Sequence, residues 1–309
     1  MKVALLAGGT GGAKLAAGMQ AVIGPDLTVI ANTGDDVEIL GVHVSPDPDL
    51  VTYWLADQVD QVRGWGIKDD SFKVFERLSR LGSPNWFSLS DLDLAACLYR
   101  KSFIEEGGTQ TAAQGQIARG LGIQATVLPM SDDPVRTQIM SSGEWRGLQE
   151  YLILEGGQTD VEGVELQGIA EAAPTPEVAA ALAEADLIVL GPSNPVISIG
   201  PILAVPGMRN LIMDSDAPVV AVSPYVAGKV VKGPTDHFMR AIDRPTTAAG
   251  VASLYTGLID AMICDSGDPD PAPADVRSFS TATLMHSAES RATVARAVLK
   301  VGERLIGNE

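Results

Sequence analysis

The chain has 309 residues, with 22 lysines and arginines against 39 aspartates and glutamates, and its formal net charge is −17. This balance argues against a surface that binds nucleic acid or anionic lipid, because both are held by clustered basic side chains. Hydrophobic residues make up 46% of the chain and charged residues 20%, which suits a protein with a large core and excludes a disordered chain.

Neither the hydropathy nor the cysteine usage indicates a membrane or secreted protein. No apolar run reaches the ~18 residues of a membrane-spanning helix, and the apolar start meets glycine by Gly8, too early for a signal peptide. The two cysteines, Cys97 and Cys264, are far apart and outside any CxxC pattern, which disfavours a disulfide framework or structural zinc. We therefore expect a cytoplasmic protein.

The first 31 residues predict a β-turn-α-β unit. Residues 3–6 form a short apolar strand, and a glycine-rich turn over residues 8–12 follows it. Residues 13–23 have helical apolar spacing, and residues 27–31 form a second apolar strand. Two short strands joined through one helix indicate parallel pairing.

The next stretch, from about residue 50 to 122, predicts a mainly helical insertion. Helical apolar spacing occurs in four segments: residues 53–62, 72–81, 92–104 and 111–121.

The remainder of the chain alternates strands with helices. Strands are expected at residues 125–128, 136–140, 149–154, 187–190 and 219–222, helices at 177–185 and 290–305, and an exposed loop at 265–275. This alternation predicts one α/β domain over residues 1–309, with a doubly wound, mostly parallel, Rossmann-like sheet.

The glycine-rich turn is the first candidate site. Backbone N–H groups of Gly9, Thr10, Gly11 and Gly12 can approach a phosphate closely at a helix N-terminus. The turn matches neither standard nucleotide pattern: Lys14 lacks the following serine or threonine of a Walker A motif, and it stands where the dinucleotide pattern needs its third glycine. The turn is either a structural one or a phosphate loop of another class.

Two pairs of carboxylates follow. Asp35 and Asp36 come after Asn32 beyond the second strand, where ligands of open α/β sheets bind, and they are candidate Mg²⁺ ligands or parts of a surface turn. Asp47 and Asp49 alternate with prolines that favour an extended stretch, so both can project in one direction, or Asp49 caps a following helix.

Two further segments carry candidate ligand contacts. Trp86 and the phenylalanine after it begin a segment over residues 86–93 that offers an apolar wall for a flat ring, or a hydrophobic staple at a helix start. Ser193 and Asn194 lie in a turn directly after the strand at residues 187–190. Polar turns after three strands indicate one shared cleft.

Together these motifs closely resemble the 2-phospho-L-lactate transferase family of coenzyme F420 biosynthesis. The resemblance covers essentially the whole chain: GGTGGAKL at 8–15, NTGDD at 32–36, SPDPD at 45–49, WGI at 65–67, LPMSDD at 128–133, GPSNPVISIGP at 191–201, SP at 223–224 and AGK at 227–229. Gluconeogenesis-factor proteins share the opening glycine turn and differ after the second strand.

The resemblance implies a reaction. A phospho-acid, either 2-phospholactate or phosphoenolpyruvate, moves from a guanosine diphosphate-linked donor to the ribityl hydroxyl of the deazaflavin Fo. GMP leaves, (dehydro) coenzyme F420-0 forms, and Mg²⁺ is the cofactor. Such a displacement needs positioning and charge neutralisation more than a covalent nucleophile. The resemblance also implies a homodimer.

The resemblance also assigns roles to residues. The glycine turn with Lys14, together with Ser193 and Asn194, would hold the guanosine diphosphate. Asn32, Asp35 and Asp36 would lie at the metal and phosphates. Asp49 would contact Fo with Arg100 nearby, and Trp86 and Ser88 would line the deazaflavin pocket. One of Asp35, Asp36 and Asp49 would accept the proton of the attacking hydroxyl.

The helix that follows Ser88 departs from the family pattern. The family usually has Gly-Asp-x-Asp-Leu-Ala-Thr-His-x-x-Arg at this position. This chain has Ser90, Ala96 and Cys97 in place of the glycine, threonine and histidine of that pattern, and it keeps the arginine as Arg100. The missing threonine and histidine remove two polar groups from the acceptor side.

Charge near the glycine turn makes Mg²⁺ a necessary part of the hypothesis. The first fifty residues contain two basic residues and six acidic ones. An anionic donor can bind there only where a metal ion and backbone N–H groups supply positive potential.

Two alternatives to the transferase are a nucleotide-sugar-binding regulatory protein of the gluconeogenesis-factor type and a dinucleotide-dependent oxidoreductase, which the glycine pattern disfavours.

Overall fold

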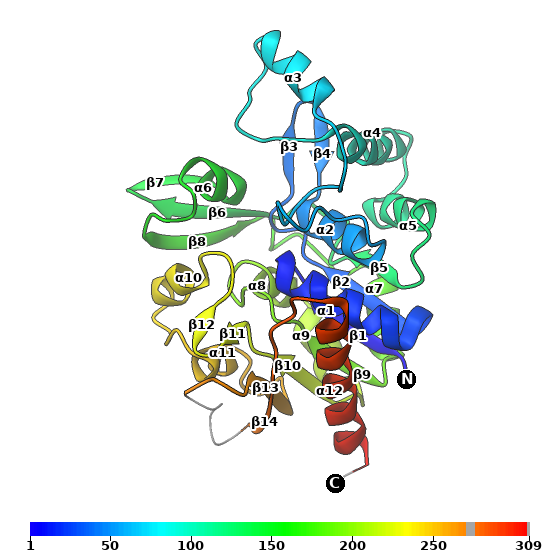
Figure 1. The fold of residues 1–309 in the computed structure, drawn as a ribbon, viewed down its shortest axis with the longest axis vertical. Helices are drawn as coiled ribbons and strands as arrows, with labels where there is room; N and C mark the ends of the chain where they lie inside the picture. The colour runs from blue at the N-terminus through cyan, green and yellow to red at the C-terminus, as the bar shows by residue number, and fades with distance from the viewer. Residues whose placement is uncertain (270–275, 308–309) are drawn as a thin grey trace.

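The computed structural model describes residues 1–269 and 276–307 and contains a seven-stranded central sheet (Figure 1). The strand order is β14-β13-β10-β9-β1-β2-β5, and every neighbouring pair is parallel. The strands are β1 (Val3–Ala7), β2 (Leu27–Ala31), β5 (Thr126–Pro129), β9 (Leu187–Leu190), β10 (Val219–Val222), β13 (Ala261–Asp265) and β14 (Arg277–Thr281). The sheet confirms the predicted doubly wound α/β fold.

The chain reverses its winding direction beside β1. From β1 it passes to β2 and β5 on one side, and later returns to β9 on the other side of β1. The residues of β1 and β9 are all buried, which explains why both read as uninterrupted apolar runs. Ligands of open parallel sheets bind beyond the carboxyl ends of the strands at such a reversal.

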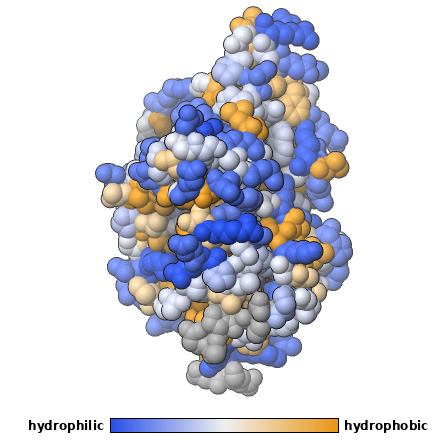
Figure 2. Space-filling view, turned by 90° about the vertical axis from the view of Figure 1, so that its left-hand side faces the viewer, coloured by the Kyte–Doolittle hydropathy of each residue, from blue (hydrophilic) through white to orange (hydrophobic). Residues whose placement is uncertain are grey.

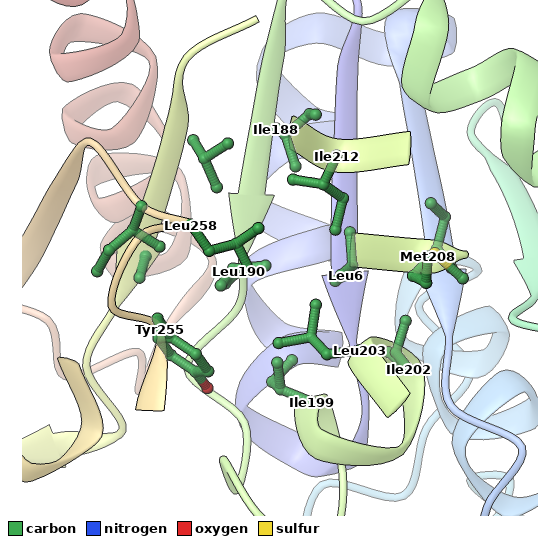
Figure 3. Packing of buried hydrophobic residues seen from close by; sticks show 14 of the residues in the cluster. Leu6, Ile188, Leu190, Ile199, Ile202, Leu203, Met208, Ile212, Tyr255 and Leu258 are labelled. Atoms are coloured by element: carbon green, nitrogen blue, oxygen red, sulfur yellow. The ribbon is translucent and has the colours of Figure 1, made fainter. Parts of the chain in front are cut away.

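Helices cover both faces of the sheet because successive strand residues point to opposite sides. Val3 and Leu5 face the layer of α1 (Gly9–Ile23), α2 (Pro46–Leu55) and α12 (Ala288–Ile306). Leu6 and Leu190 face the layer that contains Ile199 and Met208, as Figure 3 shows. That second layer consists of α7 (Pro176–Ala183), α8 (Ile199–Ala204), α9 (Met208–Met213) and α11 (Ala248–Leu254).

The segment between β2 and β5 contains the expected helices and a hairpin that the sequence did not indicate. Its elements are β3 (Val37–Ile39), β4 (Val42–Val44), α2, α3 (Lys73–Arg80), α4 (Asp91–Glu105) and α5 (Gln110–Gly120). The hairpin, α3 and α4 extend away from the central sheet at the top of Figure 1. Helix α2 of this segment reaches the glycine turn, since it packs against α1 and its Asp47 accepts the N–H of Gly9.

A second, antiparallel sheet lies beside the first, in the order β7-β6-β8 (Figure 1). The remaining elements are η1 (Gly24–Asp26), β6 (Arg136–Ser141), β7 (Glu144–Gly147), α6 (Leu148–Leu154), β8 (Val161–Gln167), β11 (Tyr225–Val226), β12 (Lys229–Val230) and α10 (Thr235–Ala241). Of these, α6 and the β11–β12 hairpin border the cavity described below.

Three local predictions were wrong. Residues 149–154 form helix α6 and not a strand, because Leu148 and Tyr151 are buried at helical spacing and Glu150 accepts the N–H of Gly147. Residues 45–49 are not extended: α2 begins at Pro46, where a missing N–H costs nothing in a first helical turn. The same helix ends at Leu55, several residues before the expected end.

Two surface expectations have partial outcomes. The loop expected at residues 265–275 begins with Asp265, which is the buried last residue of β13, and residues 270–275 lie outside the described part of the chain. No helix within the described ranges combines the length and apolar character that crossing a membrane requires. Hydrophilic side chains cover most of the face in Figure 2, with hydrophobic ones in small separate patches.

Candidate functional site

A cavity of about 530 Å³ lies at the carboxyl ends of β1 and β9, where the winding of the sheet reverses. Its polar lining comes from residues that follow strands β1, β2, β9, β10, β12 and β14 and from the start of α2. Those residues are Gly8, Gly9, Thr10, Gly11, Lys14, Asp35, Asp47, Ser193, Asn194, Ser198, Ser223, Lys232, Thr235 and Thr283. The cavity therefore brings together the glycine turn and the Ser193–Asn194 turn, as the shared-cleft prediction requires.

The glycine turn is the first turn of α1. Gly8 is extended and Gly9 has a φ of +57°, a conformation that glycine adopts without strain. A Cβ on Gly11 would lie 2.0 Å from the carbonyl oxygen of Pro192, and one on Gly12 would lie 2.5 Å from Oγ of Ser193. The glycines therefore allow the two turns to pack together, while the N–H groups of the helix start lack partners within the helix.

The turn after β9 is held by its own polar side chains. Oγ of Ser193 accepts the N–H of Gly8 at 3.2 Å. Oδ1 of Asn194 accepts the N–H groups of Val196 and Ile197 at 2.9 and 3.2 Å, and its amide donates to Thr235 at 3.3 Å. Asn194 thus shapes the cavity wall and keeps little free hydrogen-bonding capacity for a ligand.

Two carboxylates, Asp35 and Asp47, line the same cavity. Asp47 accepts hydrogen bonds from the N–H of Gly9 and from the amide of Asn32, the latter at 2.9 Å. Asp35 accepts the amide of Gln149 at 3.1 Å. Burial raises the pKa of Asp47 to about 6 against these hydrogen bonds. Burial and the negative charge of Asp47 hold the pKa of Asp35 well above its usual range.

Asp36 points into a different network from Asp35. Its carboxylate accepts hydrogen bonds from Ser45, from Nε2 of His43 and from the amide of Gln110, each at 2.8 Å. It is buried and is not part of the cavity lining. The adjacent pair predicted to bind Mg²⁺ is therefore divided between two environments, and Asp47 takes the place beside Asp35.

Asp49 lies two residues beyond Asp47 in α2 and is not part of the cavity lining. It forms an ion pair with Arg100, whose side chain is fully buried and also donates to Gln114 at 3.2 Å. Cys97 and Asp93 lie next to this pair. Burial and the nearby charge of Asp49 raise the pKa of Asp93 to about 7.

The aromatic segment is likewise outside the cavity. Trp86 packs edge-on against Phe87, with ring centroids 5.6 Å apart, beside the small core under the β3–β4 hairpin. Ser88 is half-buried in the same segment. The structure therefore does not bring Trp86, Ser88, Asp49 or Arg100 to the glycine turn.

Sequence reasoning missed several cavity residues. Ser223 follows β10 directly, so the rule that ligands bind beyond strand ends would have included it. Lys232 and Thr283 lie in loops with no pattern that predicts their position. The apolar lining of the cavity was also missed: it consists of Leu148, Leu152, Ile197, Val226, Val230, Val231, Leu284 and Met285.

The donor set at the cavity fits a hard divalent cation. Asp35 and Asp47 lie close enough together that the charge of Asp47 adds to burial in raising the pKa of Asp35. Mg²⁺ prefers carboxylate and phosphate oxygens as its ligands. Asp36 fits less well because it lies outside the cavity lining, where Ser45, His43 and Gln110 bind its oxygens. The pair available for a metal is therefore Asp35 and Asp47.

Comparison with solved structures supports the fold. A crystal structure of a UPF0052 family protein from Bacillus halodurans aligns with a TM-score of 0.61 and covers 96% of this chain and 98% of that one. The two sequences are 20% identical, so this likeness concerns the fold alone.

Comparison with sequences shows the family. The model of the 2-phospho-L-lactate transferase (CofD) family matches residues 3–300. The 2-phospho-L-lactate transferases of Methanosarcina barkeri and Methanopyrus kandleri are 36% and 38% identical over 98% and 99% of this chain and 99% of each relative. A phosphoenolpyruvate transferase of Streptomyces griseus is 36% identical over 99% of both. The chain therefore belongs to the CofD family of 2-phospho-L-lactate and phosphoenolpyruvate transferases of coenzyme F420 biosynthesis.

Proposed function

We propose that the protein moves a phospho-acid from a guanosine diphosphate-linked donor to the ribityl hydroxyl of Fo, with release of GMP and with Mg²⁺ as cofactor. One observation carries the proposal: a single cavity at the reversal of the sheet contains the glycine turn, two carboxylates and two lysines. This set can neutralise and orient a diphosphate without a covalent nucleophile, which is what phosphoryl transfer needs.

The residues of the cavity would have different roles in this reaction. The first turn of α1 presents N–H groups to the donor phosphates, and Lys14 and Lys232 add positive charge. Asp35 and Asp47 would hold Mg²⁺, which would neutralise charge on the phosphate oxygens. The Asp47 carboxylate lines the cavity, where it would accept the proton of the attacking hydroxyl.

The apolar lining of the cavity offers surface for a flat ring. Leu148 and Leu152 of α6 and Val226 and Val230 of the β11–β12 hairpin all contribute to this lining. Apolar walls with a few polar groups are typical of sites for small aromatic ligands. The acceptor-side roles of Asp49, Arg100, Trp86 and Ser88 remain predictions, since these residues lie outside this cavity.

A turnover assay tests the proposal. Purified protein is mixed with Fo, Mg²⁺ and each guanylated phospho-acid in turn, and deazaflavin products and GMP are separated by chromatography. We expect a deazaflavin phosphodiester and an equal amount of GMP with one donor, and no product with chelator. Absence of product with every donor would contradict the proposal. Binding of guanylated donors without binding of Fo would favour a regulatory protein instead.

Asp47→Asn should lower this turnover by about 10² or more, and Asp214→Asn is the matched control. Asp214 is an exposed carboxylate at the end of α9 and is not part of the cavity. We also propose a homodimer in the cytoplasm, both on the strength of the family resemblance, and light scattering in solution tests the assembly.

A further inference from the structure

The two carboxylates of the cavity are held by neutral donors. Within the part of the chain that the structure describes, no basic side chain lies within ion-pair distance of Asp35 or Asp47. Their donors include the side-chain amides of Asn32 and Gln149. Asp49 differs, because it pairs with an arginine. Amide donors fix carboxylate oxygens without cancelling their charge, which stays available for a cation.

Asn32 joins the two carboxylates on one side. Its side chain is fully buried and is not part of the cavity lining. Its amide nitrogen lies 2.9 Å from Oδ2 of Asp47 and 3.4 Å from Oδ1 of Asp35. The same nitrogen donates to the carbonyl oxygen of Ile197 at 3.2 Å, and Oδ1 of Asn32 accepts the N–H of Gly34 at 2.8 Å. Asn32 therefore fixes Asp47 and one oxygen of Asp35.

The antiparallel sheet holds Asp35 on the other side. Gln149, on α6, donates from its side-chain amide to Oδ2 of Asp35 at 3.1 Å, across 114 positions of sequence. The N–H of Thr137, on β6, donates to the carbonyl of Gly34 at 2.6 Å, which anchors the turn directly before Asp35. Gln149 is not part of the cavity lining. It reaches the site only through the second oxygen of Asp35.

This second contact matters because the two carboxylates repel each other. Like charges that share a site disfavour their own ionised, close arrangement. A side chain of Asp35 that was held at one oxygen alone could rotate away from Asp47. Mg²⁺ demands near-ideal geometry from its ligands, and partners that orient a ligand contribute strongly to metal affinity.

We propose that Gln149 is a positioning residue of the metal site, which acts through Asp35 and does not touch the ligand. The inference rests on the proposed function for the role of Asp35 and Asp47 as metal ligands. It assigns to α6, outside the central sheet, a part in metal binding that no sequence pattern indicates.

Titration of the whole chain with Mn²⁺ tests the inference, with free Mn²⁺ measured by electron paramagnetic resonance. Mn²⁺ takes the same oxygen ligands as Mg²⁺. We expect Gln149→Leu to raise the Kd for Mn²⁺ about tenfold or more, because loss of a partner that orients a metal ligand has effects of this size. Gln158→Leu is the matched control, since Gln158 is exposed beyond the end of α6 and outside the cavity lining.

Two further measurements separate positioning from a general structural loss. Thermal unfolding shows whether Gln149→Leu is folded, which we expect because Gln149 is only half-buried. Saturating Mn²⁺ should restore the turnover of Gln149→Leu, with the KM for Fo unchanged, whereas a structural defect would persist at every metal concentration.

The outcomes of the titration have distinct meanings. Wild-type affinity for Mn²⁺ in folded Gln149→Leu would overturn the role of Gln149. Equal Mn²⁺ binding by wild type and Asp35→Asn would overturn both the metal pair and that role. Mn²⁺ binding that depends on Asp35 and Gln149, in a protein that turns over no guanylated donor, would reject the proposed function and keep the positioning role.

Discussion

The backbone N–H of Gly9 donates a hydrogen bond to Oδ1 of Asp47, which ties the first turn of α1 to the first turn of α2. The two residues are 38 positions apart, and Asp47 also accepts the amide of Asn32 at 2.9 Å. The segment inserted between β2 and β5 thereby contributes a carboxylate to the site at the end of β1. Positioning of the glycine turn and of the acidic group is consequently coupled.

Exchange of Asp47 for Asn should reduce kcat by about 10² or more, because the variant loses both the negative charge and the proton acceptor of the cavity. The Mg²⁺ concentration for half-maximal turnover should rise as well. Steady-state kinetics over a range of Mg²⁺ concentrations check both effects. Equal turnover in wild type and variant would remove Asp47 from the site, and Asp214→Asn controls for a general loss of charge.

Exchange of Asp49 for Asn should lower stability. The change leaves the fully buried guanidinium of Arg100 without its counter-charge, and removal of one partner of a buried pair costs about 3–5 kcal/mol. Urea unfolding measures the loss. The control is Glu184→Gln in the exposed pair with Lys2, which should change the free energy of unfolding by less than about 1 kcal/mol. Similar values for the two variants would contradict a structural role for Asp49.

Exchange of Gly11 for Ala should weaken GDP binding by about tenfold, because a Cβ there would lie 2.0 Å from the carbonyl oxygen of Pro192 and the two turns would have to separate. Gly120→Ala in α5 meets no atom within 4 Å and should leave binding unchanged, with stability equal or up to about 1 kcal/mol higher. Titration with GDP distinguishes the two. Tight binding by Gly11→Ala would show that the turns tolerate separation.

Stability should depend on pH through Asp93. Burial, and next the charge of Asp49, raise its pKa from 3.8 to about 7 in the folded protein, so folding favours the protonated form. This contribution is fully present below pH 3.8 and is lost as the pH rises through 7. Between pH 5 and 8, urea unfolding should therefore show a larger fall for the wild type than for Asp93→Asn. Parallel falls would mean that Asp93 is not protonated in the folded state.

The sequence predicted the central sheet well because its strands are buried on both faces. The runs at Leu187–Leu190 and Val219–Val222 are uniformly apolar, and their bounds agree with the structure. Helix α6 was read as a strand because a seven-residue segment is too short for its period to be distinguished from an apolar run. The β3–β4 hairpin was missed because its strands have only three residues each.

The candidate site was only partly predictable. The glycine turn and Ser193 reach the cavity because the carboxyl ends of parallel strands meet at one edge of a sheet. Which carboxylates reach it depends on α2, because successive side chains of a helix point in different directions. Sequence patterning treated Asp47 and Asp49 as projecting together, whereas the helix directs Asp47 to the cavity and Asp49 to Arg100.

The most direct test of the central claim, that this cavity is the transferase site, is a crystal structure of the protein with GDP, Mg²⁺ and Fo. We expect the diphosphate on the first turn of α1 beside Lys14, with the metal ion on Asp35 and Asp47 and the ribityl hydroxyl directed toward the phosphates. Nucleotide bound elsewhere, with the glycine turn free and no metal at Asp35 and Asp47, would contradict it.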